Sequence, residues 1–200
     1  MIAVLSSKIF FRSVLIFNAV LVLLPVFFLF NSALRETNSF ASNPFSLAKD
    51  PHWENFSQVW SDGAFATYLK NSLIVTGGSL VVILVCALGA GFILGRYQFK
   101  GSTIIFGFIL TGMLIPAKLA ILPLFIQLKW MNLLDSHIGL ILVYASGALP
   151  AAVFIMSGFF RSLPSDLDSA ARIDGASEFQ LLTRVLVPLV RPGMAIVAIY

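Results

Sequence analysis

The polar residues that could do chemistry are few, and several gather in one short stretch, "SAARIDGASEFQLL", residues 169–182. Arg172, Asp174 and Glu178 supply charge there, and Gly175 interrupts an otherwise helical pattern. Glycine is costly inside a helix and inexpensive in a turn. The stretch could therefore be a helix–turn–helix that a partner grips, or an amphipathic helix on a membrane surface. The residues alone leave both interpretations open.

The rest of the chain offers little for catalysis or metal binding. His52 and His137 lie far apart in the sequence, and we interpret neither as a metal ligand. Cys86 is the one cysteine, so these residues can form neither an intrachain disulfide nor a cysteine cluster. The sequence contains no P-loop pattern, and no Ser–His–Asp or paired-carboxylate constellation within its apolar runs. We expect no catalytic residue, no metal and no cofactor.

The composition indicates a membrane protein. Of the 200 residues, 58% are hydrophobic and 11% are charged, whereas soluble domains are about half apolar and a quarter charged. The mean hydropathy is +0.94. Since basic residues of membrane proteins mark cytoplasmic loops, the net charge of +4 is no evidence for nucleic acid. We expect an all-α, polytopic membrane protein with no nucleic-acid partner.

Five apolar runs are predicted to be membrane spans, because about 20 apolar residues cross a bilayer core. They cover residues 9–30, 73–94, 103–115 and 138–160, and a fifth run begins at about 187. The first run could instead be a cleaved signal peptide, but its length favours an uncleaved helix. The fifth run is short when it reaches Tyr200, so we expect the sequence to end within a helix, as a fragment or a natural truncation.

The segments between the spans have their own signals. Residues 31–70 are polar and aromatic, which indicates an extramembrane segment with short interfacial helices and with Trp53 and Trp60 at headgroup level. Pro116 should end or bend the third span, so that residues 116–123 either line a pathway or form an interfacial elbow. The second span is rich in small residues, which favours close helix packing over a substrate role.

The basic residues predict the orientation. Alternating spans place residues 1–13, 95–102 and 157–191 on one side of the membrane, with eight lysines and arginines, and leave five on the other side. The denser side should be cytoplasmic. The N-terminus and the stretch at 169–182 would then both be cytoplasmic.

Local signals extend the polar stretch to residues 165–187. The acids of "SLPSDLD" suit the first turn of a helix, and Ser177 could cap a second helix after Gly175. Pro188 and Pro192 would close the segment. Small side chains would leave room for a partner to pack closely, and large ones would supply apolar grip; these are Ala170, Ala171 and Ala176, and Phe179 and Leu182.

The stretch "AARIDGASEFQLLTRVLVPLVRP", residues 170–192, closely resembles the "EAA" loop of permeases of ABC importers. Upstream, "NSLIVTG", "GRYQFKG", "LIPAKLAILPLF" and "LPAAVFIMSGFFRSLPSDL" occur in the order found in the carbohydrate-uptake branch, specifically the maltose-type second permease subunit. The resemblance covers about residues 53–200. It implies a helix bundle of the type I ABC importer kind, with about five of six expected spans present.

The resemblance also implies a function and a set of partners. The chain would be a non-enzymatic permease subunit in a bacterial cytoplasmic membrane, importing sugars or oligosaccharides. Its partners would be cytoplasmic ABC ATPase subunits, a second homologous permease subunit, an extracytoplasmic solute-binding protein, the sugar substrate and membrane lipid. The solute-binding protein would dock on residues 44–70 and 125–137.

The ATPase-coupling residues that the resemblance implies lie in and just after the loop: Asp168, Ser169, Ala170, Ala171, Asp174, Gly175, Ala176, Phe179, Pro188 and Pro192. Two departures from the family pattern stand out. Ser169 occupies the position of the glutamate that names the loop, and we expect neighbouring Asp168 to replace part of its charge. The family also continues through a sixth span.

Three other functions stay open on the residues. A membrane-embedded enzyme would need polar groups inside the spans, where Lys118 is the only charged candidate. A truncated, non-transporting interaction subunit and an ABC permease for a non-sugar solute are the others. The expected division of the chain is an N-terminal transmembrane helix at 1–30, an extracytoplasmic segment at 31–70 and a permease core at 71–200.

Overall fold

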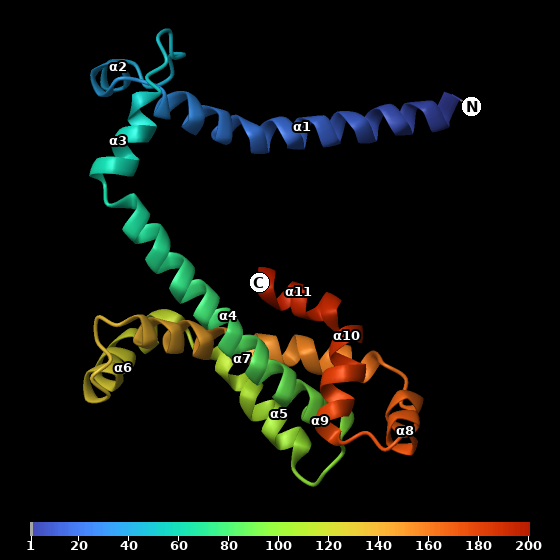
Figure 1. Cartoon of the computed structure of the whole chain (residues 1–200). Coiled ribbons are helices and arrows are strands. Elements are labelled where there is room, and N and C mark those ends of the chain that lie inside the picture. Colours follow the sequence, from blue (N-terminus) through green and yellow to red (C-terminus); the bar gives the residue numbers. More distant parts are fainter. Residues whose placement is uncertain (1) are drawn as a thin grey trace. The chain divides into compact units, whose positions relative to one another are not determined.

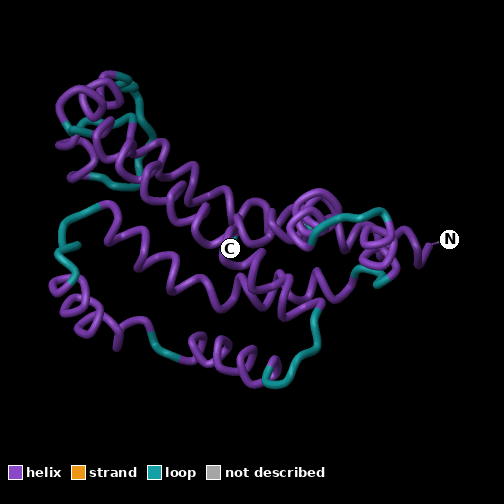
Figure 2. The backbone as a smooth tube through the Cα atoms, turned by 60° about the horizontal axis from the view of Figure 1, so that its bottom comes forward, coloured by secondary structure: helices purple, strands orange, loops and turns teal. Residues whose placement is uncertain are grey.

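The computed structural model describes residues 2–200, and it describes side-chain surroundings for all of these except residues 2–7, 9 and 117. Every regular element within 2–200 is a helix (Figure 2), which confirms the predicted fold class. The chain forms two compact units, Met1–Leu69 and Lys70–Tyr200. Three helices are long and apolar enough to cross a membrane, or up to five if each of two bent helix pairs is one span.

The first unit contains α1 (Ile2–Ala33), α2 (Thr37–Ser42) and α3 (Glu54–Asp62) (Figure 1). The stretch Phe10–Ala33 of α1 meets the criteria for a span. The segment after α1 folds back on its end, because the Asn31 side chain donates to the Ser46 carbonyl and accepts from the Ala48 amide, each at 2.9 Å. The short helices expected in residues 31–70 are therefore α2 and α3.

The second unit begins within α4 (Phe65–Arg96). The predicted span at 73–94 lies inside this helix, but the helix begins eight residues before that span. Residues 65–70, which were expected to belong to the polar segment, are therefore helical. The apolar pattern alone does not show this start, because the first two turns of α4 include the polar residues Tyr68, Lys70 and Asn71.

The third apolar run is broken at the predicted proline. It forms α5 (Ser102–Thr111) and the short 3₁₀ helix η1 (Gly112–Leu114), and α6 (Ala117–Trp130) follows. Pro116 is the N-cap of α6. The two halves are bent by 105°, since proline cannot donate the backbone hydrogen bond that a continuous helix requires.

The fourth span, α7 (His137–Ser162), packs closely on α4. A Cβ placed on Gly91 would lie 2.8 Å from the Met156 Cβ and 3.1 Å from the Ser157 amide nitrogen. Met156 and Phe160 are fully buried. The absent side chain at Gly91 thus permits this approach of the two helices, which supports the packing interpretation at that position.

The last part of the chain is a series of short helices: α8 (Asp166–Ile173), α9 (Glu178–Gln180), the π-helix η2 (Leu181–Leu186), α10 (Val187–Leu189) and α11 (Arg191–Ile199). Leu181 and Leu186 of η2 are fully buried in the core. The chain bends by 72° between Leu189 and Arg191. A second helix after Gly175 is therefore present as predicted, with a π-helical part that the sequence pattern did not predict.

Candidate functional site

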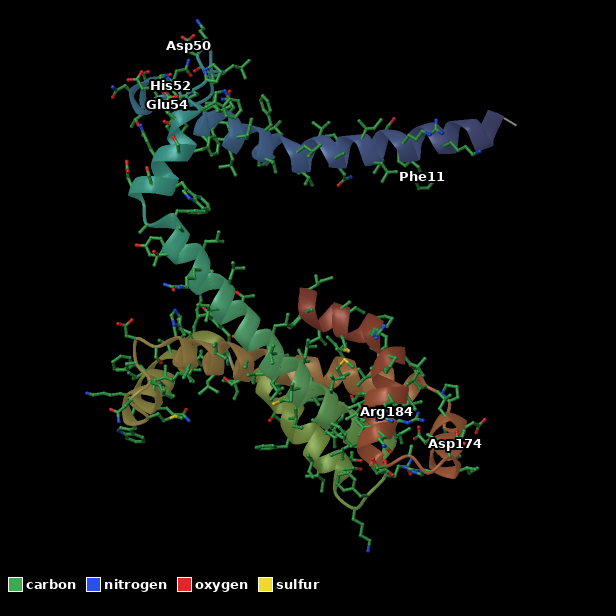
Figure 3. The ribbon with its side chains drawn as sticks, in the orientation of Figure 1. Phe11, Asp50, His52, Glu54, Asp174 and Arg184 are labelled. Carbon is green, nitrogen blue, oxygen red and sulfur yellow. The ribbon has the colours of Figure 1, made fainter. Side chains whose placement is uncertain are left out.

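The candidate site is the segment 165–187, whose two arms are α8 and the helices α9 and η2 (Figure 3, where Asp174 and Arg184 mark the two arms). Gly175 joins the arms with a φ of +81°, a conformation that glycine adopts without a steric penalty. The Gly175 and Ala176 amides donate to the carbonyls of Arg172 and Ala171, at 3.1 and 2.9 Å. These bonds satisfy carbonyls at the end of α8.

Ser177 starts the second arm with a capping box. Its hydroxyl accepts from the Gln180 amide at 3.3 Å, and the Gln180 side chain accepts from the Ser177 amide at 2.9 Å. Two amides that would otherwise lack partners at the helix start are thereby satisfied. The predicted cap at Ser177 is confirmed, so the turn has a fixed geometry on both sides of Gly175.

Arg96, the last residue of α4, holds the first turn of α8. Its Nε and one terminal nitrogen donate to the two carboxylate oxygens of Asp168, at 2.9 and 2.5 Å. The side chains are 6% and 13% exposed. A bidentate arginine–carboxylate pair fixes orientation as well as distance. Because both side chains are largely buried, water screens this ion pair less than it screens a surface pair.

The same guanidinium caps the end of α7. It donates to the carbonyls of Phe160 at 3.1 Å, Leu163 at 2.6 Å and Pro164 at 3.0 Å. Carbonyls at a helix C-terminus lack partners within the helix, so Arg96 satisfies groups that would otherwise need water. One side chain thus joins the ends of α4 and α7 to the start of α8. We call Arg96, Asp168 and these three carbonyls the arginine joint.

A second polar group connects α4 to the other arm. The Tyr97 hydroxyl donates to a Glu178 carboxylate oxygen, and Arg172 donates to Glu178 at 3.0 Å and to the Tyr97 hydroxyl at 3.2 Å. The Tyr97 hydrogen bond and then Arg172 lower the pKa of Glu178. Burial, followed by the hydrogen bond to Glu178, raises the pKa of Tyr97. Arg172 and Glu178 are about half exposed, so solvent screens this pair.

The outer surface of the segment presents isolated apolar side chains beside small ones. Ile173 is 85% exposed and Phe179 is 74% exposed. The exposed residues between and beside them are Ser169, Ala170, Arg172, Asp174, Gly175, Ser177 and Glu178. Both apolar side chains are therefore available to contact another protein.

Three of the predicted coupling residues do not lie on this exposed outer surface. Ala171 is 8% exposed and packs in the core of its own chain, so it offers no room for a partner. Asp168 contacts Arg96 instead of lying on the outer surface, and its replacement of part of the missing glutamate's charge stays a prediction. Ala176 is half-buried against the core. These side chains face inward because they lie on the core side of α8 and its turn.

Pro188 and Pro192 lie past the two arms. Pro188 is in α10 and Pro192 is in the first turn of α11, and both are exposed. The 72° bend falls between the two helices that contain them. Proline tolerates the first turn of a helix, where its missing donor is not needed, so the pair is consistent with the predicted end of the segment.

Sequence reasoning missed Arg96 and Tyr97 as members of the site. Both lie in "GRYQFKG", which indicated only a basic turn on the cytoplasmic side. Arg96 is separated from Asp168 by 72 positions. Within residues 2–200 no group of three or more histidine, cysteine, aspartate or glutamate residues could hold a metal ion, and His52 pairs with Glu54 at 2.6 Å (Figure 3).

Comparison with known proteins shows the family in which this arrangement occurs. Residues 87–200 match the family described as binding-protein-dependent transport system inner membrane component. The chain belongs to this family. The matched part is more than half of the chain and includes α7, the arginine joint and the segment 165–187. Membership of an inner-membrane family agrees with the apolar helices of both units.

Two relatives of this chain are named for sugar transport. The chain is 38% identical over 94% of its length to the diacetylchitobiose uptake system permease protein of Streptomyces coelicolor, and 32% identical over 88% of its length to the trehalose transport system permease protein of Mycobacterium tuberculosis. The chain spans 63% and 64% of the length of these two relatives. Both are transporter permease subunits by name.

A solved structure has the same fold. The chain aligns, with a TM-score of 0.82 and 24% sequence identity, to a bacterial ABC transporter involved in the import of the acidic polysaccharide alginate. The alignment covers 97% of this chain and 69% of the other. At this identity the likeness concerns the fold alone.

Proposed function

We propose that this chain is the permease subunit of an ATP-driven, binding-protein-dependent importer of sugars or oligosaccharides. The family and the sugar-transport names of its relatives support the solute class. The segment 165–187 would dock on a cytoplasmic ATPase subunit. A homologous permease subunit would complete the pathway, and an extracytoplasmic binding protein would deliver the sugar.

The observation that carries this proposal is the attachment of an exposed turn to two apolar helices. Ile173 and Phe179 project from the segment, while Asp168 is held by Arg96 at the ends of α4 and α7. A movement of the ATPase that displaces the turn would therefore also displace both helices. Nucleotide-driven closure of two ATPase subunits would in this way move the helices that bound the pathway.

The orientation follows from the basic residues. The side that contains Arg96, Lys100 and the segment 165–187 has the higher density of lysine and arginine and would be cytoplasmic. The N-terminus would be on the same side. The turn between α6 and α7 would face the binding protein.

Site-directed crosslinking tests the docking. Cys86 is replaced by alanine, and a single cysteine is placed at Ile173 in the chain co-expressed with the ATPase subunits of sugar importers. We expect a crosslink to the ATPase from Ile173→Cys and none from Lys100→Cys, an exposed position outside the segment. Absence of a crosslink from Ile173→Cys, when small cytoplasmic reagents still label it, would contradict the docking.

Transport is tested separately with the assembled importer in proteoliposomes. We expect uptake of a radiolabelled neutral oligosaccharide that requires ATP on the cytoplasmic side and binding protein on the other. Uptake of an amino acid or peptide in place of every sugar tested would instead support a permease for a non-sugar solute.

A further inference from the structure

The second unit contains a cavity with a mixed polar and apolar lining at the end of α7 opposite to α8. Its volume is about 650 Å³, within the range of about 300–1,000 Å³ that is typical of small-molecule sites. The cavity lies between α4, the turn from α6 to α7, and the first turns of α7. Its polar lining comes from all three: Asn71, Ser72 and Thr76; Asp135; and His137 and Tyr144.

The polar side chains of α4 are unusual for their surroundings. Asn71, Ser72 and Thr76 lie at the start of a helix whose next charged residue is Arg96. Polar side chains in a membrane-spanning helix seldom face lipid and often line a substrate pathway. Here all three line the cavity. Their placement thus has an explanation if the cavity is filled by water or by a polar ligand.

The turn before α7 directs a carboxylate into this lining. Asp135 has a φ of +53°, and Asn132 has a φ of +54°, a region in which aspartate and asparagine are tolerated better than most residues. Ser136 then caps α7, since its hydroxyl accepts from the Gly139 amide at 3.0 Å. Ser136 is committed to the helix, whereas Asp135 and His137 are exposed.

The chemistry of the lining fits an uncharged saccharide. An amide, a carboxylate, hydroxyls and an imidazole can accept from and donate to neighbouring sugar hydroxyls. Tyr144, 57% exposed, offers a ring face on which the apolar face of a sugar can pack. The lining contains one carboxylate and neither lysine nor arginine. A uronic acid would meet a like charge and no compensating cation.

We propose that this cavity is a saccharide-binding subsite that selects uncharged over acidic saccharides, with Tyr144 as its packing surface and Asp135 as the residue that repels acidic ones. The inference rests on the proposed function, which it deepens by naming the place and the charge class of the solute. It distinguishes this permease from its structural neighbour, a transporter involved in the import of an acidic polysaccharide.

Binding is measured by saturation-transfer NMR on the assembled importer in nanodiscs without binding protein. The probes are N,N′-diacetylchitobiose, which is uncharged, and a mannuronic acid disaccharide, which is acidic. We expect saturation of the uncharged probe and little of the acidic one. Tyr144→Ala should abolish saturation of the uncharged probe. Tyr68→Ala, which removes another exposed tyrosine that lies outside the cavity, should leave it unchanged.

The charge selection is tested by Asp135→Asn, because asparagine tolerates the backbone conformation at this position. Removal of one like charge should raise the affinity for the acidic probe about fivefold, the effect of two unit charges about 4 Å apart in water. Asp62→Asn, outside the cavity, is the matched control. Equal binding of both probes by the unmodified importer, or identical spectra for Tyr144→Ala and Tyr68→Ala, would overturn the subsite.

The two proposals fail in different ways. If proteoliposomes take up no saccharide on addition of ATP, but Tyr144 is still required for binding of the uncharged probe, the import function is wrong and the subsite stands. If uptake is normal and neither probe depends on Tyr144 or Asp135, the subsite is wrong and the import function stands.

Discussion

The two ends of α7 differ in how they are held. At the Ser162 end, the buried guanidinium of Arg96 binds three backbone carbonyls and a carboxylate. At the His137 end, exposed polar side chains surround a cavity of about 650 Å³. A helix that is fixed at one end and lines an open cavity at the other can carry a displacement from the first end to the second. The proposed importer needs that connection between its ATPase and its solute.

Loss of the arginine joint should have the largest effect on the difference between the two ends of α7. Arg96→Ala leaves the Asp168 carboxylate without its partner, and removal of one member of a buried ion pair typically costs about 3–5 kcal/mol. We expect α8 to detach from the end of α7, seen as faster amide hydrogen exchange in residues 163–173. Exchange at the His137 end should change little.

A double substitution separates the ion pair from its surroundings. Arg96→Met combined with Asp168→Leu removes both charges. The doubly substituted protein should be less destabilised than the Arg96→Ala protein. The carbonyls of Phe160, Leu163 and Pro164 still lose their donor, so exchange should stay faster than in the unmodified chain. Equal exchange in all three proteins would show that the joint does not hold α8.

Substitution of Gly175, in the turn between the two arms, should have the next largest effect. Gly175 has a positive φ, and an added Cβ would meet nothing within 4 Å, so a substitution there tests the backbone alone. Gly175→Val should cost about 1–2 kcal/mol in local stability and should lower ATP-driven uptake without loss of membrane insertion. Gly175→Asn is the matched variant, because asparagine tolerates this conformation, and it should retain most uptake. Equal uptake by the two variants would contradict a rigid turn.

These residues also show which features of the structure could be predicted from the sequence. The turn at Gly175 and the cap at Ser177 depend on neighbours within a few positions, and local rules predicted both. Arg96 and Asp168 meet across 72 positions, and Asn71 and Asp135, which are also far apart in the sequence, line the same cavity. A single sequence contains no signal that pairs such distant residues, so the arginine joint and the cavity required the fold.

The same limit applies to Ala171 and Asp168, whose role in ATPase coupling stays a prediction. Ala171 and Asp168 follow the pattern of a docking surface, but the pattern does not say which face of α8 packs on the core. Three-dimensional packing puts Ala171 inside and turns Asp168 to Arg96. The predicted spans at 9–30, 73–94 and 138–160 largely coincide with helices that are long and apolar enough to cross a membrane, because the length of an apolar run is a local property.

The exposed Tyr97–Glu178–Arg172 group should give the stability of the turn a dependence on pH. The pKa of Glu178 lies below its ordinary value of 4.5, so the folded state favours the carboxylate. This contribution to stability is present above pH 4.5 and is lost as the pH falls through the lowered pKa. Tyr97→Phe removes the largest cause and should raise the pKa of Glu178, measured by NMR of its side-chain carboxyl carbon.

Arg172→Gln is the companion to that measurement. It removes the second cause and should raise the pKa of Glu178 by less than Tyr97→Phe does. A larger rise in Arg172→Gln would reverse the order of the two contributions. Neither variant should alter amide exchange in residues 163–167, because the arginine joint is independent of this group.

The smallest effect is expected in the first unit, where α3 should lie at the membrane surface. The Trp53 ring is 6.2 Å from the rings of both Phe30, on α1, and Phe56, and Trp53 and Trp60 are 59% and 56% exposed. The apolar face of α3 thus continues the lipid-facing surface of α1, and tryptophan favours the headgroup level.

In a chain that keeps only Trp53, with Trp60 and Trp130 replaced by phenylalanine, a lipid brominated near its headgroup should quench fluorescence more than one brominated near the chain end. Stronger quenching by aqueous iodide than by either lipid would place this face in water, and protection only after addition of the binding protein would make it part of that docking surface.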